Sequence, residues 1–224
     1  MYVLGGDKMP RHDPDQKTKQ DILETAMHLF TEKGIENVNI EDVVKEVGVT
    51  RGAFYHYFKS REELISGVIY KSFNDNNPFI LANKQEGLNA LEKLRFVFKL
   101  DLRPRLDMDD TLKSDMQKLG DNPIIFKNEL LTQINVVAPH VERLLTEGNK
   151  DGSLSVKYPK QTAQVISLLV SSWLDIFTFQ VSYTEYADKV SFLELLGKLL
   201  GVPFMDKEMK ELFLEIGKVQ FEAK

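Results

Sequence analysis

The residues of this sequence that are best suited to ligand chemistry lie in one short segment, residues 51–61. The segment combines cations with hydrogen-bonding aromatic side chains, and it contains no carboxylate. Its residues of these two kinds are Arg51, Tyr55, His56, Tyr57, Lys59 and Arg61. Such groups suit phosphate oxygens and the edges of bases. Because the whole chain carries a net charge of −5, any contact with DNA must come from a local patch of this kind.

Two short helices are expected to position this segment. Asn39 can cap a helix that ends at Gly48, and Thr50 can cap a second helix that runs to Tyr57. Two helices joined by so short a turn have helix-turn-helix geometry, in which the second helix enters the major groove of DNA and the first crosses the backbone. The alternative is a small helical subdomain with a solvated basic turn.

Taken together, these residues resemble the helix-turn-helix of the tetracycline-repressor (TetR) family of bacterial transcriptional regulators. The positions that match the family pattern as they stand are Gly48, Val49, Gly52, Tyr55, Phe58, Ser60, Glu62 and Leu64. Thr50 replaces a serine of that pattern and Arg61 a lysine, while Tyr57 replaces a histidine and Ala53 a threonine. The resemblance covers residues 16–76, because the first helix of the family also fits, at Ile22, Leu23, Ala26, Phe30 and Gly34.

The segment and the resemblance together predict which residues bind DNA. They are Asn39, Thr50, Arg51, Gly52, Ala53, Tyr55, His56, Tyr57, Lys59 and Arg61. We expect Tyr55, Tyr57 and Arg61 to contact phosphates, so that loss of Arg61 would weaken binding to all sequences alike. Arg51 and His56 are expected at base edges, where they would select the operator sequence.

Helical periodicity of apolar residues runs through the whole sequence, and no convincing alternating strand pattern occurs. We therefore predict an all-α protein, with Phe54 and Phe58 in its core. A turn cluster, Asn74–Pro78, marks the boundary between two domains. The predicted parts are a flexible N-terminal arm, a helix-turn-helix DNA-binding domain and a larger helical ligand-binding and dimerisation domain, at residues 1–15, 16–76 and 77–224.

The second domain is expected to consist of further helices. They are predicted at residues 85–102, 109–119, 122–147 (kinked at Pro139), 159–183, 188–200 and 206–221. We expect residues 159–183 and 206–221 to form a symmetric dimer interface, since the last helix carries a clean apolar stripe that must cover something. The alternative is that this last helix closes its own domain.

The resemblance to the TetR family implies that the second domain dimerises and encloses a small-molecule cavity. Candidate lining residues are large apolar side chains on its predicted helices: Phe96, Leu100, Met116, Phe126, Leu130, Trp173 and Phe177. Trp173 is the first choice, because it is the sole tryptophan and lies on a helix that is apolar on more than one face. A plain core role is the alternative for each of them. Polar groups that could orient a ligand are Arg103, Arg105 and Asp175.

Other functional classes are excluded by what the sequence lacks. The sequence contains no cysteine, which excludes thiolate catalysis, disulfides and cysteine-ligated metals. Phosphate-binding, dinucleotide-binding and nucleophile-elbow motifs are missing, and the histidines show no metal-binding spacing, so we expect no enzyme, cofactor or metal. The most apolar stretch, 165–181, is interrupted by polar residues, so we expect no membrane span and a cytoplasmic location.

These observations predict a homodimeric transcriptional repressor that binds double-stranded operator DNA of palindromic sequence. An unidentified small-molecule effector would release it by binding the non-DNA conformation more tightly. The alternative is a constitutive DNA-binding regulator or architectural factor with no effector. An empty, largely apolar cavity around Trp173 would favour the first hypothesis, and a filled core there the second.

Overall fold

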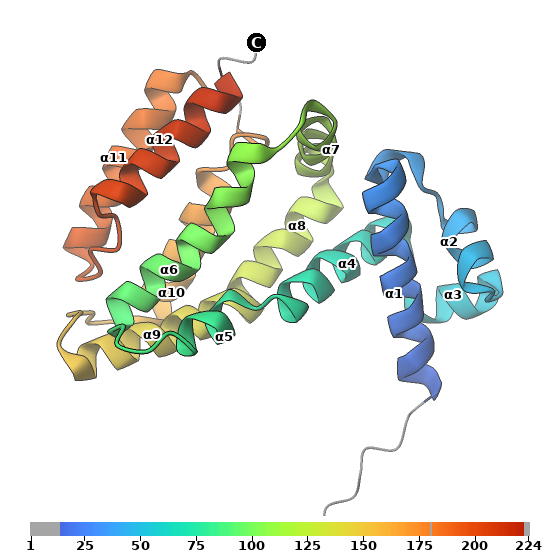
Figure 1. Ribbon diagram of the computed structural model, residues 1–224, viewed down its shortest axis with the longest axis horizontal. Helices are drawn as coiled ribbons and strands as arrows, with labels where there is room; N and C mark the ends of the chain where they lie inside the picture. Colours follow the sequence, from blue (N-terminus) through green and yellow to red (C-terminus); the bar gives the residue numbers. More distant parts are fainter. Residues whose placement is uncertain (1–13, 180, 222–224) are drawn as a thin grey trace, which may run out of the picture. The chain divides into compact units, whose positions relative to one another are not determined.

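The computed structural model describes residues 14–179 and 181–221, and these residues form helices and turns but no strand (Figure 1). The prediction of an all-α protein is confirmed. The chain folds into two compact units, Met1–Lys71 and Ser72–Lys224, and helix α4 (Arg61–Asp75) runs through the junction between them. The limits predicted from the sequence place this junction a few residues later, after residue 76. The predicted N-terminal arm lies almost entirely outside the described residues.

The N-terminal unit consists of α1 (Pro14–Lys33), a 3₁₀ turn η1 (Ile35–Asn37), α2 (Ile40–Val47), α3 (Arg51–Tyr57) and the first part of α4. Its helices bury one apolar side each. The buried residues of this unit are Ile22, Leu23, Ala26, Leu29, Phe30, Val38, Val43, Phe54, Phe58, Leu64, Ile65 and Val68. The predicted core positions of Phe54 and Phe58 are therefore confirmed.

Side-chain caps determine where α2 and α3 begin. The Asn39 Oδ1 atom accepts a hydrogen bond from the Asp42 N–H at 3.0 Å, and Asp42 Oδ2 accepts one from the Asn39 N–H at 3.0 Å. This reciprocal capping box satisfies backbone donors that the first helical turn leaves free. Gly48, with a φ of 77°, ends α2 in the left-handed conformation that favours glycine. Thr50 Oγ1 then accepts from the Ala53 N–H at 3.1 Å and starts α3.

The C-terminal unit packs its helices around one hydrophobic core. In chain order its α-helices are α5 (Pro78–Asn83), α6 (Ala90–Leu102), α7 (Asp110–Asp121), α8 (Pro123–Thr132), α9 (Ala138–Asp151), α10 (Pro159–Leu168), α11 (Tyr183–Leu199) and α12 (Lys207–Phe221). A 3₁₀ turn η2 (Arg103–Asp107) follows α6. Helix α9 packs against α6 and α10, and α11 lies beside α12 (Figure 1).

Two π-helical turns interrupt the helices of this unit. The first, η3 (Gln133–Val137), separates α8 from α9, and the second, η4 (Leu169–Trp173), follows α10. The helix predicted at residues 122–147 is continuous from Pro123 to Asp151 with the π turn η3 inside it, and Pro139 lies just after this π turn, in the first turn of α9. A π turn closes i→i+5 hydrogen bonds, so it changes the direction of the side chains that follow it.

The helix predicted at residues 159–183 is wrong in its second half, since helical geometry ends at Trp173. Asp175 Oδ2 accepts a hydrogen bond from the Thr178 N–H at 2.8 Å and forms a turn. Ser182 Oγ then accepts from the Glu185 N–H at 3.2 Å and starts α11. The apolar content of this segment signalled burial correctly, but the polar side chains within it determine where the helix stops.

The final helix α12 packs inside its own unit. Met209, Phe213 and Ile216 are 0%, 1% and 2% exposed, buried by contacts of α12 with α11, α6 and η2 of the same chain. The apolar stripe therefore covers a surface of its own chain, as the alternative interpretation expected, and it does not by itself identify a dimer interface. A dimer interface on this helix stays a prediction.

An ion-pair bridge joins α11 to α12. Glu194 of α11 accepts hydrogen bonds from Lys198 Nζ at 2.5 Å and from Lys210 Nζ of α12 at 2.7 Å. These bonds lower the pKa of Glu194 to about 2. Because the folded pKa lies below the ordinary value, the bridge contributes stability above that value and loses it as the pH falls toward 2. The Glu194 and Lys210 side chains are 24% and 34% exposed, so solvent screens the bridge in part and its contribution is modest.

Candidate DNA-binding site and ligand cavity

Helix α3 presents one buried side and one open side. Phe54 is 0% exposed and Phe58, the residue that ends the helix, is 3% exposed. Tyr55, by contrast, is 43% exposed, and Arg51 and His56 are exposed with it. The buried phenylalanines attach the helix to its unit, so the cationic and hydrogen-bonding side chains face solvent.

Two predicted DNA-binding residues act as helix caps in this structure. The side-chain oxygens of Asn39 and Thr50 accept backbone hydrogen bonds at the first turns of α2 and α3. The Thr50 hydroxyl keeps its own proton, so it can still donate to a phosphate oxygen. Both residues therefore determine where the two helices start, and Thr50 retains a possible DNA contact.

Gly52 lies on the open side of α3, where a side chain would find space. The nearest heavy atom to a Cβ built at this glycine is Thr50 Oγ1, at 3.8 Å. The fold itself therefore does not demand glycine at this position. The absence of a side chain instead leaves room for another molecule to approach the helix backbone. Ala53, the next predicted residue, is half-buried.

Arg51 forms an ion pair with Glu41 of α2. Their side chains are 63% and 53% exposed, so solvent screens the pair and it contributes little to stability. Arg51 can therefore exchange this partner for a base edge at small cost. The pair also links the first turns of the two helices of the motif.

Tyr57, His56 and Lys59 gather at the C-terminal end of α3. The Tyr57 hydroxyl donates to Asp15 Oδ1 of α1 at 2.5 Å, and His56 Nε2 lies 3.8 Å from the same oxygen. Lys59 Nζ donates to the carbonyl oxygens of Tyr55 at 2.7 Å and His56 at 3.3 Å. A lysine in this position satisfies free carbonyls and complements the helix dipole.

Arg61 has a structural role that the sequence did not reveal. Its Nε donates to the carbonyl oxygen of Val38 at 3.0 Å, and its NH2 nitrogen donates to the carbonyl oxygen of Ile35. The guanidinium thereby ties the start of α4 to the η1–α2 connection. The sequence shows that residue 61 is a cation, but it does not show that the guanidinium points toward these two carbonyl oxygens. Its assignment to phosphate remains a prediction.

An Arg61→Ala variant is expected to destabilise the N-terminal unit by about 1–3 kcal/mol, because two partly buried carbonyls lose a charged donor. Amide hydrogen exchange of residues 35–38 in the full chain would measure this, with Lys59→Ala as the control cation. Unchanged exchange, together with a salt dependence of DNA binding reduced by about one unit, would contradict the structural role and support a phosphate contact.

An Arg51→Ala variant is expected to reduce discrimination at one base pair of the operator by about 1–3 kcal/mol, because a guanidinium reads guanine through two parallel hydrogen bonds. Binding to a set of single-base operator variants would measure the loss. Glu41→Gln is the matched control, since it frees Arg51 from its ion pair and should keep the base preference. Equal weakening of all sequences by Arg51→Ala would instead make Arg51 a phosphate contact.

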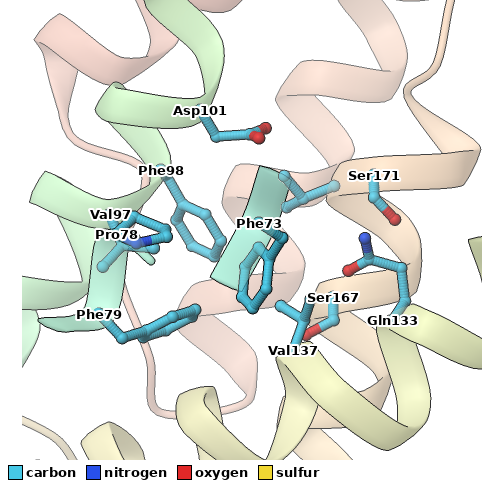
Figure 2. Close-up of a pocket in the computed structure, with 11 residues that line it drawn as sticks. Phe73, Pro78, Phe79, Val97, Phe98, Asp101, Gln133, Val137, Ser167 and Ser171 are labelled. Carbon is cyan, nitrogen blue, oxygen red and sulfur yellow. The ribbon is translucent and has the colours of Figure 1, made fainter. Parts of the chain in front are cut away.

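A cavity in the C-terminal unit lies among α4, α5, α6, α10 and the two π turns (Figure 2). Its empty volume is about 470 Å³, including the space open to solvent. The lining residues are Phe73, Pro78, Phe79, Val97, Phe98, Asp101, Gln133, Val137, Ser167, Val170 and Ser171. The walls are mostly apolar with a few polar groups, which is typical of small-molecule sites.

None of the residues predicted to bind a ligand lines this cavity. Those residues are Phe96, Leu100, Met116, Phe126, Leu130, Trp173 and Phe177. Phe96 and Trp173 pack against the core from partly buried positions. The Trp173 ring meets Phe192 edge to face at 5.9 Å, and Lys189 Nζ lies 5.2 Å from its centre. Three other residues of the same segment line the cavity, namely Ser167, Val170 and Ser171.

The charged groups beside the cavity have hydrogen-bond partners within the chain. Arg105 NH2 donates to Asp101 Oδ2 at 3.2 Å. Gln133 Nε2 donates to Glu129 Oε1 at 2.8 Å, and burial raises the pKa of Glu129. Of the other polar residues predicted to orient a ligand, Arg103 pairs with Glu208 and Asp175 caps the turn at Thr178.

Within the described residues, no helix is long and apolar enough to cross a membrane. Over the same part of the chain, no group of three or more potential ligands gathers where it could hold a metal ion.

Residues 22–73 match the family model described as bacterial regulatory proteins, tetR family. The HTH-type transcriptional regulator AcrR of Shigella flexneri is 40% identical over 53 residues, which cover 24% of this chain and 25% of that protein. The chain thus spans about a quarter of this relative. The Transposon Tn10 TetC protein of Escherichia coli is 26% identical over 176 residues, 78% of this chain and 85% of that protein.

Solved structures share the fold over most of the chain. A TetR-family transcriptional regulator from Pectobacterium atrosepticum has a TM-score of 0.57 at 19% identity, covering 84% of this chain and 96% of that one. RolR in complex with resorcinol has a TM-score of 0.59 at 18% identity, covering 91% and 96%. A repressor, FadR of Thermus thermophilus with lauroyl-CoA, has a TM-score of 0.59 at 20% identity, covering 84% and 96%.

A helix-turn-helix unit followed by a larger all-α unit defines the class of two-domain helix-turn-helix transcription regulators. The N-terminal unit matches the tetR family of bacterial regulatory proteins over residues 22–73, and most of the chain shares the fold of a solved TetR-family regulator.

Proposed function

We propose that this chain is a transcriptional repressor that binds a palindromic operator as a homodimer and releases it when a small molecule occupies the C-terminal unit. The observation that carries the proposal is the open side of α3. It holds Arg51, Gly52, Tyr55 and His56 in solvent on a helix attached by buried phenylalanines. The curated relative IcaR of Staphylococcus aureus, 23% identical over 159 residues, is a negative transcriptional regulator.

On DNA, the first turn of α3 would enter the major groove. Arg51 would leave Glu41 and read a base edge, while the Thr50 hydroxyl would donate to a phosphate. The bare backbone at Gly52 would permit close approach. Tyr55 would contact the backbone of one strand beside them. Together these residues combine sequence selection with salt-dependent attraction.

A second copy of the chain would pack on the exposed stripe of α11. Phe192, Leu195 and Leu199 are 53%, 54% and 75% exposed, and they recur at the spacing of one helix face. Large apolar side chains grouped in this way mark interaction surfaces. A two-fold symmetric partner fits best, because a palindromic operator requires two recognition helices related by a two-fold axis.

The effector would bind in the cavity lined by Phe73 and Phe98. Phe73 belongs to α4, the helix that continues into the N-terminal unit, so a ligand can favour one position of this helix over another. Such a ligand shifts the equilibrium only by its difference in affinity between the two states. The neighbours RolR and FadR were solved with resorcinol and lauroyl-CoA, two small molecules.

Operator release tests this proposal against a constitutive regulator. A labelled operator bound to the chain would be titrated with a library of metabolites and drugs, and release followed by fluorescence anisotropy. We expect at least one compound to release DNA from the parent chain and to lose this effect in a Val137→Phe variant, whose cavity is partly filled. Release that persists in this variant would place the effector elsewhere, and no release by any compound would favour the constitutive regulator.

A further inference from the structure

Two π-helical turns of the C-terminal unit face the same cavity. Gln133 and Val137 of η3 line it, and so do Val170 and Ser171 of η4. In Figure 2, Gln133 and Ser171 lie near each other at one edge of the cavity. π turns are rare and occur frequently at functional sites, because the wider turn redirects a side chain without ending the helix. Two of them converging on one space indicate that the lining is built for a ligand.

The cavity contains a buried hydroxyl that has no partner. Ser167 is 3% exposed, and its Oγ makes no hydrogen bond to any residue that the structure describes. A serine in a helix commonly bonds back to the carbonyl of the preceding turn, which this one does not do. Leaving a buried hydroxyl unpaired costs free energy, so such a group in a cavity suggests that a ligand supplies the missing bond.

Gln133 supplies a complementary group beside Ser167. Its Nε2 donates to Glu129, which leaves the amide oxygen as the atom available to the cavity. In Figure 2 this oxygen points toward the side of the cavity where Phe73 and Ser167 lie. A ligand hydroxyl can accept from Ser167 and donate to Gln133 at the same time, whereas an ether or a carbonyl can only accept.

The remaining walls select against charge and favour a flat ring. Phe73, Phe79 and Phe98 surround the space with aromatic rings. Asp101 is the one charged residue among the lining residues, and it is already paired with Arg105 at 3.2 Å. Asp101 is 57% exposed and therefore lies at the solvent side of the lining. A charged ligand group would lose its hydration among the aromatic rings, where the lining offers no free counter-charge.

We propose that the cavity binds an uncharged aromatic molecule that carries a hydroxyl group, which hydrogen-bonds to Ser167 and Gln133 between the three phenylalanine rings. The inference rests on the proposed function only in treating this ligand as the effector. Binding itself is a property of the C-terminal unit and is measured on the full chain without DNA.

Four probes that share a naphthalene ring test the ligand class by isothermal titration calorimetry. They are 2-naphthol, 2-methylnaphthalene, 2-naphthoate and 2-naphthylmethylamine. We expect 2-naphthol to bind about tenfold more tightly than 2-methylnaphthalene, which lacks the hydroxyl, and the two charged probes to bind more weakly than either. Tighter binding of the carboxylate or of the amine, or equal affinity for naphthol and methylnaphthalene, would overturn the proposal.

The Ser167→Ala variant isolates the hydroxyl. We expect its preference for 2-naphthol over 2-methylnaphthalene to fall about threefold or more, because the bond from Ser167 is lost while the bond to Gln133 remains. We also expect it to melt no lower than the parent chain, because it removes an unpaired buried polar group. Ser172→Ala is the matched control, a buried serine of the same segment that does not line the cavity. A naphthol preference in Ser167→Ala as large as that of the parent chain would contradict the assignment of this residue.

Operator release by the same probes separates the two proposals. Ser167-dependent binding of naphthol without release of DNA would support the ligand class and contradict the effector role of this cavity. Release of DNA by a charged probe would support the effector role and contradict the ligand class.

Discussion

A chain with Leu195→Glu and Leu199→Glu is expected to be monomeric and to bind its operator about 10²–10⁴-fold more weakly than the parent. Both side chains are exposed on one face of α11, so the substitutions leave the hydrophobic core of the unit intact. They place carboxylates opposite each other across a two-fold interface, which would separate the two copies. Each half-site would then be bound independently, and the advantage of binding both at once would be lost.

Sedimentation velocity and operator binding, measured on the same samples, check this result. Leu112→Glu is the matched control, because Leu112 is an exposed leucine of α7 outside the α11 stripe and should leave both properties unchanged. If the double variant remains dimeric, the dimer interface does not lie on the exposed stripe of α11. A parent chain that sediments as a monomer at micromolar concentration would contradict the dimer itself.

A Phe54→Ala variant is expected to lose about 3–5 kcal/mol of stability in the N-terminal unit, because it removes a fully buried ring and leaves a cavity. The ring packs edge to face against Tyr55 at 5.5 Å and lies 5.7 Å from Phe58, so the attachment of α3 would loosen with it. Urea unfolding followed by circular dichroism and hydrogen exchange of residues 40–58 would measure the loss.

Tyr55→Ala is the internal control, since it removes a neighbouring ring from the open side of the same helix. We expect it to weaken DNA binding while the N-terminal unit keeps most of its stability. Similar destabilisation by both variants would mean that Tyr55 belongs to the core and that the open side of α3 is misassigned.

The N-terminal unit could be predicted closely because its signals are local. Asn39 and Thr50 start their helices through bonds to residues three positions away. Phe54 and Phe58 follow helical spacing within one short helix, so their burial could be predicted from sequence alone. Arg61 departs from this rule, because its carbonyl partners lie 23 and 26 residues away in the chain.

The lining of the cavity could not be predicted for a physical reason. Choosing Trp173 and Phe177 assumed one continuous helix from 159 to 183, but the π turn η4 changes the direction of side chains within it. Val170 and Ser171 therefore face the cavity, while Trp173 packs beside Phe192. No residue pattern in this segment predicts a π turn.

The last helix shows a second limit. The stripe of Met209, Phe213 and Ile216 correctly signals a buried face, and the same stripe would occur on a helix that packs against a partner. Helix α11 also carries apolar residues that are buried within the chain, such as Val190 and Leu193, so its exposed apolar residues could not be distinguished in the sequence. The packing of α11 on α12 shows which apolar residues of α11 are buried and which are exposed.

Selection of DNA from a random pool by the purified chain tests the central claim most directly. The account predicts enrichment of a two-fold symmetric sequence whose half-site centres lie about 34–36 Å apart or at a multiple of that spacing. It also predicts that Arg51→Ala relaxes the preference at one position in each half-site. A selection that enriches no sequence, or one whose enriched sequence has no two-fold symmetry and does not respond to Arg51→Ala, would contradict it.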